Sequence, residues 1–313
     1  MFGGGTDHPS WFNNHGGAVV SFTIDKYSYI SLRELPPFFS HKFRVAYSKV
    51  ETTDHVEEIL HPAVRQSFIK YAGGLKLELH HHGDLPARSG VGSSSAFAVG
   101  LIKSLYAING VEIENYSLAK EAIDLEQIDL LETVGSQDQI ACTFGGMNSI
   151  EFGPNNSWNL NKIILELKYL KDFESRIVLI YSGISRFSSD VSKGLIHKIE
   201  TKAKLMNRTK ELAHEFSSLL LSKGDLSLVG EMLKESWSIK KQINPLSITD
   251  QLEIFYQSAL VKGASAGKIL GAGGGGFFLF WVEPHVRDNF IKRMAPLVHV
   301  PISITSDGCT RIL

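Results

Sequence analysis

Apolar and polar positions in the first half of the chain follow two different periods. Short β-rich runs with one expected buried face predict strands, and in the last of them Leu77 and Leu79 alternate with Lys76, Glu78 and His80. Helical spacing instead predicts helices, one of them following Gly92 and stopping near Gly110. We expect strands over 18–24, 27–32, 43–48 and 75–80, and helices over 62–72, 93–109 and 117–131, with Ser117 as the N-cap of the last.

The second half repeats this mixture of elements without a strict β-α-β-α alternation, which favours the α+β fold class. The turn-rich segment at 153–157 suggests a boundary, and we expect two domains, 1–165 and 166–313. The charged region 189–222 is interpreted either as a solvated amphipathic helix or as a lid that brings a cation to a substrate. We expect strands over 176–181, 277–282 and 302–305, and helices over 189–222, 226–242, 248–262 and 284–294.

Composition narrows the class of protein. With 313 residues, 43% of them hydrophobic, 21% charged and a formal net charge of −1, the chain fits a globular protein with no nucleic-acid partner. Two cysteines, Cys142 and Cys309, are too few for a disulfide framework, so we expect packed thiols in a cytoplasmic protein. No apolar run reaches the roughly 20 residues of a membrane span, and no secretory signal is evident.

The strongest chemical signal is the segment Asp84-Leu-Pro-Ala-Arg-Ser-Gly-Val-Gly-Ser-Ser-Ser95, between an expected strand and an expected helix. Unpaired N–H groups at a helix start favour an anion there. Gly90 and Gly92 allow the backbone to approach a polyphosphate, and the serines add hydroxyls for phosphate or magnesium. The loop has neither the Walker A lysine nor the three-glycine dinucleotide spacing. The other interpretation is a turn that only caps a helix.

An acidic pair follows this loop. Glu126 lies in the expected helix 117–131, and Asp138 lies in the turn-like Gly135-Ser-Gln-Asp-Gln139. Phosphoryl transfer needs one acid to hold a metal and one to orient or deprotonate the attacking hydroxyl. On chemistry alone Asp124, Asp129 and Glu132 compete with them, and any one acid here could simply belong to a solvated helix face.

Glycines also cluster at both ends of the chain. Gly271-Ala-Gly-Gly-Gly-Gly276 precedes the aromatic run 277–281, so either a ligand or another chain segment should pass close to that backbone. Gly3-Gly-Gly-Thr-Asp7 could bring Asp7 to a polar ligand, or it could be a frayed terminus.

Together these segments resemble the GHMP kinases, a family named for galactokinase, homoserine kinase, mevalonate kinase and phosphomevalonate kinase. The central motif of that family is Pro, three residues, then Gly-Leu-Gly-Ser-Ser. Here it reads Pro86-Ala-Arg-Ser-Gly-Val-Gly-Ser-Ser94, and the C-terminal glycine motif resembles Lys268-Ile-Leu-Gly-Ala-Gly-Gly-Gly-Gly-Phe277. The resemblance implies the GHMP kinase fold, two-lobed, with the active site between the N- and C-terminal halves.

A finer resemblance is to bacterial heptose 7-phosphate 1-kinases. It rests on the opening at Gly3–Asp7, on Ile24-Asp-Lys-Tyr27, on Asp84–Arg88, on Gln137-Asp-Gln139 and on Ser182-Gly-Ile-Ser-Arg186. This resemblance implies ATP and Mg²⁺ as cofactors and transfer to the anomeric C1 hydroxyl of D-glycero-D-manno-heptose 7-phosphate, giving the 1,7-bisphosphate used for surface polysaccharide. The alternatives are a fucose or galactose 1-kinase and a non-catalytic nucleotide-binding relative. The expected state is a monomer or homodimer, with no membrane partner.

Carried over residue by residue, the resemblance makes Asp138 the catalytic aspartate, and Glu126 with Ser94 the magnesium ligands. ATP would bind at Pro86, Arg88, Ser89, Gly90, Val91, Gly92, Ser93, Ser94 and Ser95. The acceptor would meet Gly4, Gly5, Thr6, Asp7, Lys26, Arg186, Gly273, Gly274 and Gly275. Cations for the 7-phosphate would come from Lys26, Arg88, Arg186 and Lys193. Relatives usually carry further residues with a Pro-Leu-Arg strand before the first glycines, so either the native chain extends upstream of Met1 or it lacks that strand.

Overall fold

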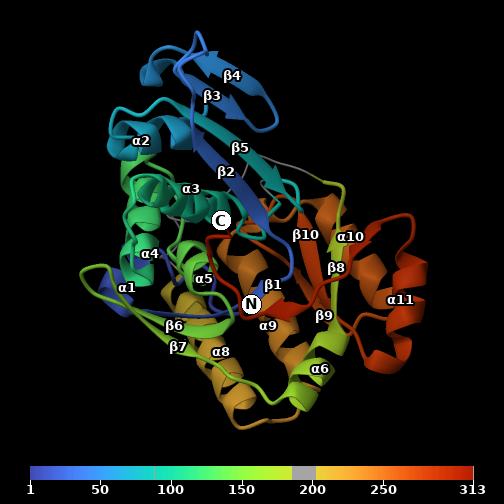
Figure 1. The fold of residues 1–313 in the computed structure, drawn as a ribbon. Helices are drawn as coiled ribbons and strands as arrows, with labels where there is room; N and C mark the ends of the chain where they lie inside the picture. The colour runs from blue at the N-terminus through green and yellow to red at the C-terminus, as the bar shows by residue number, and fades with distance from the viewer. Residues whose placement is uncertain (88, 185–201, 313) are drawn as a thin grey trace. The chain divides into compact units, whose positions relative to one another are not determined.

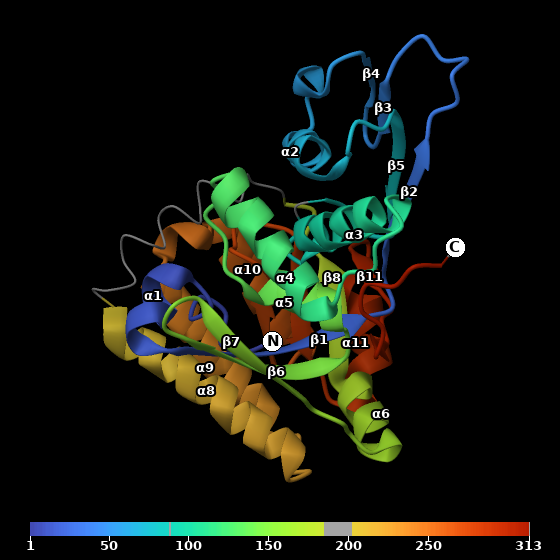
Figure 2. The same ribbon diagram turned by 60° about the vertical axis from the view of Figure 1, so that its left-hand side comes forward.

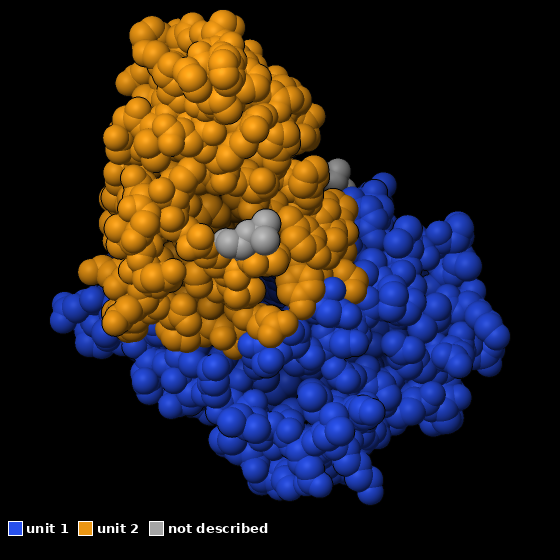
Figure 3. Space-filling model, viewed as in Figure 1, with its two compact units in different colours: residues 1–25, 88–91, 146–306 blue, residues 26–87, 92–145, 307–313 orange. Residues whose placement is uncertain are grey.

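The computed structural model of the chain describes residues 1–87, 89–184 and 202–312 (Figure 1). The chain forms two compact units, and each is assembled from separate stretches of sequence (Figure 3). Unit 1 comprises residues 1–25, 88–91 and 146–306, and unit 2 comprises 26–87, 92–145 and 307–313. The expected domains 1–165 and 166–313 stay a prediction, since a compact unit and a sequence-contiguous domain are different divisions of a chain.

Unit 1 contains two four-stranded antiparallel sheets. One has the order β12-β1-β6-β7 and the other the order β11-β8-β10-β9. In the second sheet the strand β10 is buried along its whole length and lies between β8 and β9. Its Phe278, for example, is opposite Ile180 of β8 and Ile269 of β9. The strands are β1 (Gly17–Ile24), β6 (Met147–Gly153), β7 (Ser157–Lys162), β8 (Ile177–Tyr181), β9 (Ala266–Ile269), β10 (Phe277–Trp281), β11 (Val298–Val300) and β12 (Ile304–Thr305).

Helices cover the sheets of unit 1. Trp237 of α9 packs on Phe278 of β10, and Phe255 of α10 packs on Phe278 and Phe280. Each fully buried Phe of this kind contributes about 1.5–3 kcal/mol. The helices are α1 (Pro9–His15), α6 (Leu167–Arg176), α8 (Ala203–Leu221), α9 (Leu228–Ile243), α10 (Asp250–Lys262) and α11 (Arg287–Met294), with 3₁₀ turns at Pro245–Ser247 and Pro284–Val286.

Unit 2 is a mixed sheet of order β2-β5-β3-β4 with helices against one face, as Figure 2 shows for α2 and α3. Among the described strand pairs of this sheet, β3 and β5 run parallel and the others antiparallel. Leu77 and Leu79 of β5 pack on Phe68 and Phe97. The elements are β2 (Ser28–Glu34), β3 (Phe43–Ala46), β4 (Val50–Thr53), a 3₁₀ turn (Val56–Glu58), α2 (Pro62–Tyr71), β5 (Leu77–Gly83), α3 (Ser93–Ile108), α4 (Asn115–Asp124), the π-helix η2 (Leu125–Asp129) and α5 (Gln137–Phe144).

The structure confirms the α+β class and most predicted elements, and corrects two of them. The helix expected over 117–131 begins earlier, at Asn115 with Glu114 as N-cap, so Ser117 is not the cap. That helix also turns into a π-helix at Leu125. The segment of Asp138, expected as a turn, is the first turn of α5. The region expected to be helical over 189–222 is represented by α8, and its part at 189–201 lies outside the described residues.

In the described part of the chain, no helix combines the length and the apolar character that a membrane crossing requires.

Candidate active site

The segment that the sequence predicts to bind phosphate leads into the longest helix of unit 2, α3. Gly92 precedes the helix with φ of 75°, a left-handed conformation that suits glycine. Its carbonyl accepts the N–H of Ala96 at 2.9 Å, so Ser93, Ser94 and Ser95 form the first turn. The amide groups of such a turn have no intrahelical acceptor, and Gly92 has no side chain to cap them. The helix start can therefore stabilise an anion.

The carboxyl group of Asp138 lies at this helix start. A Cβ placed on Gly92 would lie 3.6 Å from Asp138 Cγ and 3.7 Å from its Oδ2. One turn further along α5, the Cys142 thiol donates to the Gly92 carbonyl at 3.8 Å, which fixes α5 against the same residue. Because Gly92 and Asp138 are 46 positions apart in the sequence, only the tertiary fold brings the acid and the helix start together.

Glu126 is the second acid, and its side chain is almost fully buried with three donors around it. Ser94 Oγ donates to Oε1 at 2.9 Å, and Ser95 Oγ donates to Oε2 at 2.9 Å. Gln139 Nε2 also donates to Oε2. Burial raises the pKa of Glu126, and these three hydrogen bonds oppose the shift because they favour the charged form. The structure thus joins the serines of α3 to Glu126 and leaves a carboxylate at the helix start.

A local irregularity places Glu126. The N–H of Leu130 donates to the Leu125 carbonyl at 2.9 Å, an i→i+5 bond that defines the π-helix η2. Within this turn Glu126 is only 2% exposed, while Ile128 and the following Leu131 face solvent. Such π turns often occur at functional sites. The hydrophobic pattern could not predict this turn, since a single inserted residue leaves no periodic signal.

The competing acids occupy other environments. Asp129 pairs with Lys70 at 3.5 Å, and Glu132 is exposed on the loop after η2. Asp124 ends α4 and is half-buried. Sequence analysis did not single out Gln139, although its place next to Asp138 in Gln137-Asp-Gln139 was the available signal.

In unit 1 the residues preceding Gly92 interlock with the C-terminal glycine cluster. The N–H of Phe277 donates to the Ser89 carbonyl at 3.1 Å. A Cβ on Gly276 would lie 2.2 Å from that same carbonyl oxygen, and a Cβ on Gly90 would lie 2.6 Å from the Leu270 carbonyl oxygen. Glycine is required because two backbones touch here. The sequence left open whether a ligand or another chain segment passes close to this cluster. At Gly276 it is a chain segment, the one that contains Ser89.

The middle of the cluster packs on another segment of unit 1. A Cβ on Gly273 would lie 2.7 Å from Ser247 Cβ, and the N–H of Gly274 donates to the Ser247 carbonyl at 2.7 Å. It remains a prediction that the phosphoryl acceptor contacts Gly273, Gly274 and Gly275.

The N-terminal segment of unit 1 is an ordered turn rather than a frayed end. Asp7 is 2% exposed, and its Oδ1 accepts the N–H of Gly5 at 2.8 Å. Thr6 Oγ1 donates to the carbonyls of Gly3 at 2.8 Å and Ala18 at 3.0 Å. Gly4 is exposed beside it. The turn fixes the Asp7 backbone and carboxyl.

Of the four cations expected to meet a 7-phosphate, the structure describes only Lys26, which follows β1 and precedes β2 in the sequence and is half-buried. Arg88, Arg186 and Lys193 lie outside the described residues.

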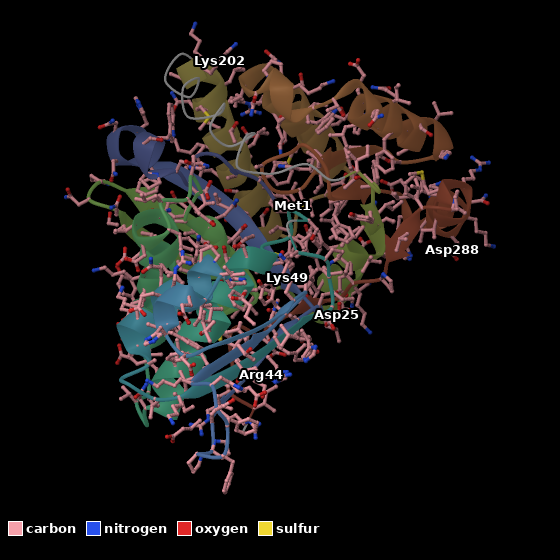
Figure 4. All side chains as sticks on the ribbon, turned by 90° about the horizontal axis from the view of Figure 1, so that it is seen from above. Met1, Asp25, Arg44, Lys49, Lys202 and Asp288 are labelled. Atoms are coloured by element: carbon pink, nitrogen blue, oxygen red, sulfur yellow. The ribbon has the colours of Figure 1, made fainter. Side chains whose placement is uncertain are left out.

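A separate cavity of about 520 Å³ lies on the face of β2 and β5, lined by Ser31, Arg33, Glu78, His80 and His82. Its buried carboxylate, Glu78, is neutralised by Arg33 and by Arg44, which Figure 4 labels on β3, and His80 Nε2 lies 2.9 Å from Glu78 Oε1. None of the motifs that predict phosphate chemistry lines this cavity.

The donor set at Glu126 fits Mg²⁺. This ion takes hard oxygen ligands and is usually held by one or two carboxylates together with substrate phosphates, not by a complete protein cage. The Glu126 carboxylate and the Ser94 hydroxyl are such ligands. Within the described residues, no group of three or more His, Cys, Asp or Glu side chains could hold a metal by itself. Water and phosphate oxygens are the ligands that usually complete the coordination of Mg²⁺ at such a site.

Comparison with known proteins agrees with this geometry. Residues 56–146 match the GHMP kinases N terminal domain, and residues 216–297 match the GHMP kinases C terminal domain. The chain is 30% identical over 307 residues to the D-glycero-alpha-D-manno-heptose 7-phosphate kinase of Campylobacter jejuni, covering 94% of this chain and 90% of the relative. It is 25% identical to the galactokinase of Pyrococcus furiosus, covering 74% of this chain and 70% of that one.

Solved structures show the same fold. A D-glycero-D-manno-heptose 1-phosphate kinase from Bacteroides thetaiotaomicron superimposes with a TM-score of 0.79 at 24% identity, covering 98% of this chain and 94% of that chain. A putative sugar kinase from Campylobacter jejuni gives 0.67 at 26% identity, covering 98% and 93%. The chain belongs to the GHMP kinase family and is a phosphotransferase that acts on an alcohol group.

Proposed function

We propose that the protein is an ATP-dependent kinase that phosphorylates the anomeric C1 hydroxyl of D-glycero-D-manno-heptose 7-phosphate to give the 1,7-bisphosphate. One observation carries this proposal: the carboxyl group of Asp138 lies against Gly92 at the start of α3, whose next residues bond Glu126. A base, an anion-binding helix start and a buried carboxylate are the three groups that phosphoryl transfer requires. The heptose acceptor is supported by the 30% identity to the Campylobacter jejuni kinase.

In the proposed reaction, the C1 hydroxyl oxygen attacks the γ-phosphorus of ATP. The new C1–O–P linkage forms as the bond from the γ-phosphorus to its bridging oxygen breaks, and ADP leaves with that oxygen. Asp138 orients the hydroxyl and accepts its proton, and the first-turn amides of α3 hold the phosphate charge. Mg²⁺, held by Glu126 and Ser94, would supply further positive charge at the phosphates.

The product would serve the synthesis of nucleotide-activated heptose for surface polysaccharide, and the site of action would be the cytoplasm, where ATP is available. Asp7 and Lys26 would contact the acceptor. A second acceptor class, an unphosphorylated sugar such as galactose, is favoured by the similarity to the Pyrococcus furiosus galactokinase.

The test is ADP release from Mg-ATP with heptose 7-phosphate, mannose, fucose, galactose and mevalonate as acceptors. The proposal expects turnover confined to the heptose phosphate. Turnover confined to an unphosphorylated sugar would contradict the acceptor, and nucleotide binding without turnover on any of them would support a non-catalytic relative.

A further inference from the structure

The two oxygens of the Glu126 carboxylate are engaged unequally. Oε2 accepts two hydrogen bonds, from Ser95 Oγ at 2.9 Å and from Gln139 Nε2. Oε1 accepts one, from Ser94 Oγ at 2.9 Å. A carboxylate oxygen has two lone-pair positions in its plane. Among the described residues, Oε2 is therefore saturated, and Oε1 retains one position beside the Ser94 hydroxyl.

Gln139 connects this carboxylate to the other acid. It follows Asp138 directly in the first turn of α5, and it is 1% exposed. Its Nε2 reaches Glu126 in η2, so one side chain joins the element that carries Asp138 to the element that carries Glu126. Ser95 holds the same oxygen, but it stands on α3 next to Ser94 and makes no such connection.

A purely structural role would satisfy both ends of a buried amide. The Oε1 of Gln139 is buried and has no hydrogen-bond partner among the described residues. Burying an unpaired oxygen opposes folding, and the charge-assisted bond from Nε2 favours it, so the two effects offset each other. An apolar side chain of similar length would fill this space without leaving an oxygen unpaired. The role of the amide is therefore to donate a hydrogen bond to Glu126.

We propose that Gln139 is a positioning residue for the kinase reaction: it holds Glu126 Oε2 so that Oε1, together with Ser94, faces the cation, and it fixes Asp138 relative to that site. The inference rests on the proposed function. Residues that orient metal ligands typically change metal affinity or activity by about 10–100-fold when they are replaced.

The test compares Gln139→Met, which has similar length without the amide, with Gln139→Glu, which has the same size but replaces the donor by an acceptor. Thr143→Val is the matched control, because Thr143 is equally buried in α5 and its hydroxyl donates to the Gln139 carbonyl, at 2.8 Å, and not to Glu126. Calorimetric titration gives the Kd of a non-hydrolysable ATP analogue with Mg²⁺ and with EDTA. The ratio of the two constants measures how much the cation strengthens binding, independently of turnover.

We expect Gln139→Met to lose about 10–100-fold of that Mg²⁺-dependent gain, with the Kd in EDTA unchanged. Gln139→Glu should lose more, because a second carboxylate would face Glu126, and Thr143→Val should keep the gain. Raised Mg²⁺ should restore part of the turnover of Gln139→Met.

The positioning role would be overturned if folded Gln139→Met showed the same Mg²⁺-dependent gain as the wild-type protein. It would also be overturned if Gln139→Met and Thr143→Val lost equal amounts of that gain. If Gln139→Met does not fold, the comparison is made between folded Gln139→Glu and Thr143→Val. A larger loss of the Mg²⁺-dependent gain in Gln139→Glu supports the positioning role, and equal losses overturn it. If the wild-type protein itself shows no Mg²⁺-dependent nucleotide binding, the proposed function fails, and the inference fails with it.

Discussion

Replacing Gly276 by alanine is the most direct test of the interlocked backbones in unit 1. The new Cβ would lie 2.2 Å from the Ser89 carbonyl oxygen and 2.7 Å from its carbon, both of them backbone atoms. Gly276 cannot move away easily, since its carbonyl accepts from Ser182 N at 2.9 Å and Ser182 Oγ at 2.7 Å, and its N–H donates to the Ile184 carbonyl at 2.8 Å.

Two effects set the size of the loss. The φ of Gly276 is +95°, and a left-handed conformation costs an L-residue about 1–2 kcal/mol. Forcing an extra carbon into a packed site costs about 1–3 kcal/mol more. We therefore expect Gly276→Ala to lower the free energy of unfolding of unit 1 by about 2–5 kcal/mol. Turnover should also fall, because Ser89 belongs to the segment proposed to bind ATP.

Gly263→Ala separates the two effects. Gly263 also lies in unit 1 with a positive φ, +123°, but a Cβ there meets nothing within 4 Å, so only the conformational cost applies. Urea denaturation followed by tryptophan fluorescence is the assay, since Trp11, Trp158, Trp237 and Trp281 all lie in unit 1. Equal losses of stability in the two variants would refute the claim that the backbones touch at Gly276.

Two further predictions concern charge. His80, then Arg33 and Arg44, hold the pKa of Glu78 at about 2, below its ordinary 4.5, so the stabilisation from the charged form is complete above pH 4.5 and disappears as pH falls toward 2. The stability lost in Glu78→Gln, measured by urea denaturation, should thus be smaller at pH 3 than at pH 7, and a constant loss would contradict this reasoning. Burial, then the nearby Lys268, lower the pKa of Lys240 from 10.5 to about 7, so the folded state binds fewer protons than the unfolded state between these values. Wild-type stability relative to Lys240→Met should therefore rise from pH 7 to pH 10, and a flat or falling difference would count against it.

Local patterns predicted the elements whose burial is regular. Strand β10 and helices α2, α3 and α10 have apolar side chains at strand or helix spacing, and their limits were predicted to within a few residues. Strand β6 was not predicted, because its buried positions include the polar Asn148 and Ser149. Helix α1 was also not predicted, since seven residues are too short for a periodic signal even though Trp11 and Phe12 are buried.

In the candidate site, too, some features were predicted from the sequence and others were not. Motifs drew attention to Gly92, Glu126 and Asp138, and the structure brings Asp138 to Gly92 and joins Glu126 to Ser94. The π turn that contains Glu126 was not predicted, because a single inserted residue leaves no periodic signal. The bond from Gln139 to Glu126 was not predicted either, because it joins two separate elements. The same holds for the clash that excludes a side chain at Gly276.

The catalytic role of Asp138 is the central claim, and the turnover of Asp138→Asn tests it most directly. The amide has the same shape but cannot accept the proton, so kcat should fall by about 10²–10⁴-fold while the Kd of the Mg²⁺-bound ATP analogue stays close to wild type. Asp129→Asn, which removes an acid paired with Lys70, serves as the control and should keep its turnover. Near-wild-type turnover by folded Asp138→Asn would contradict the account.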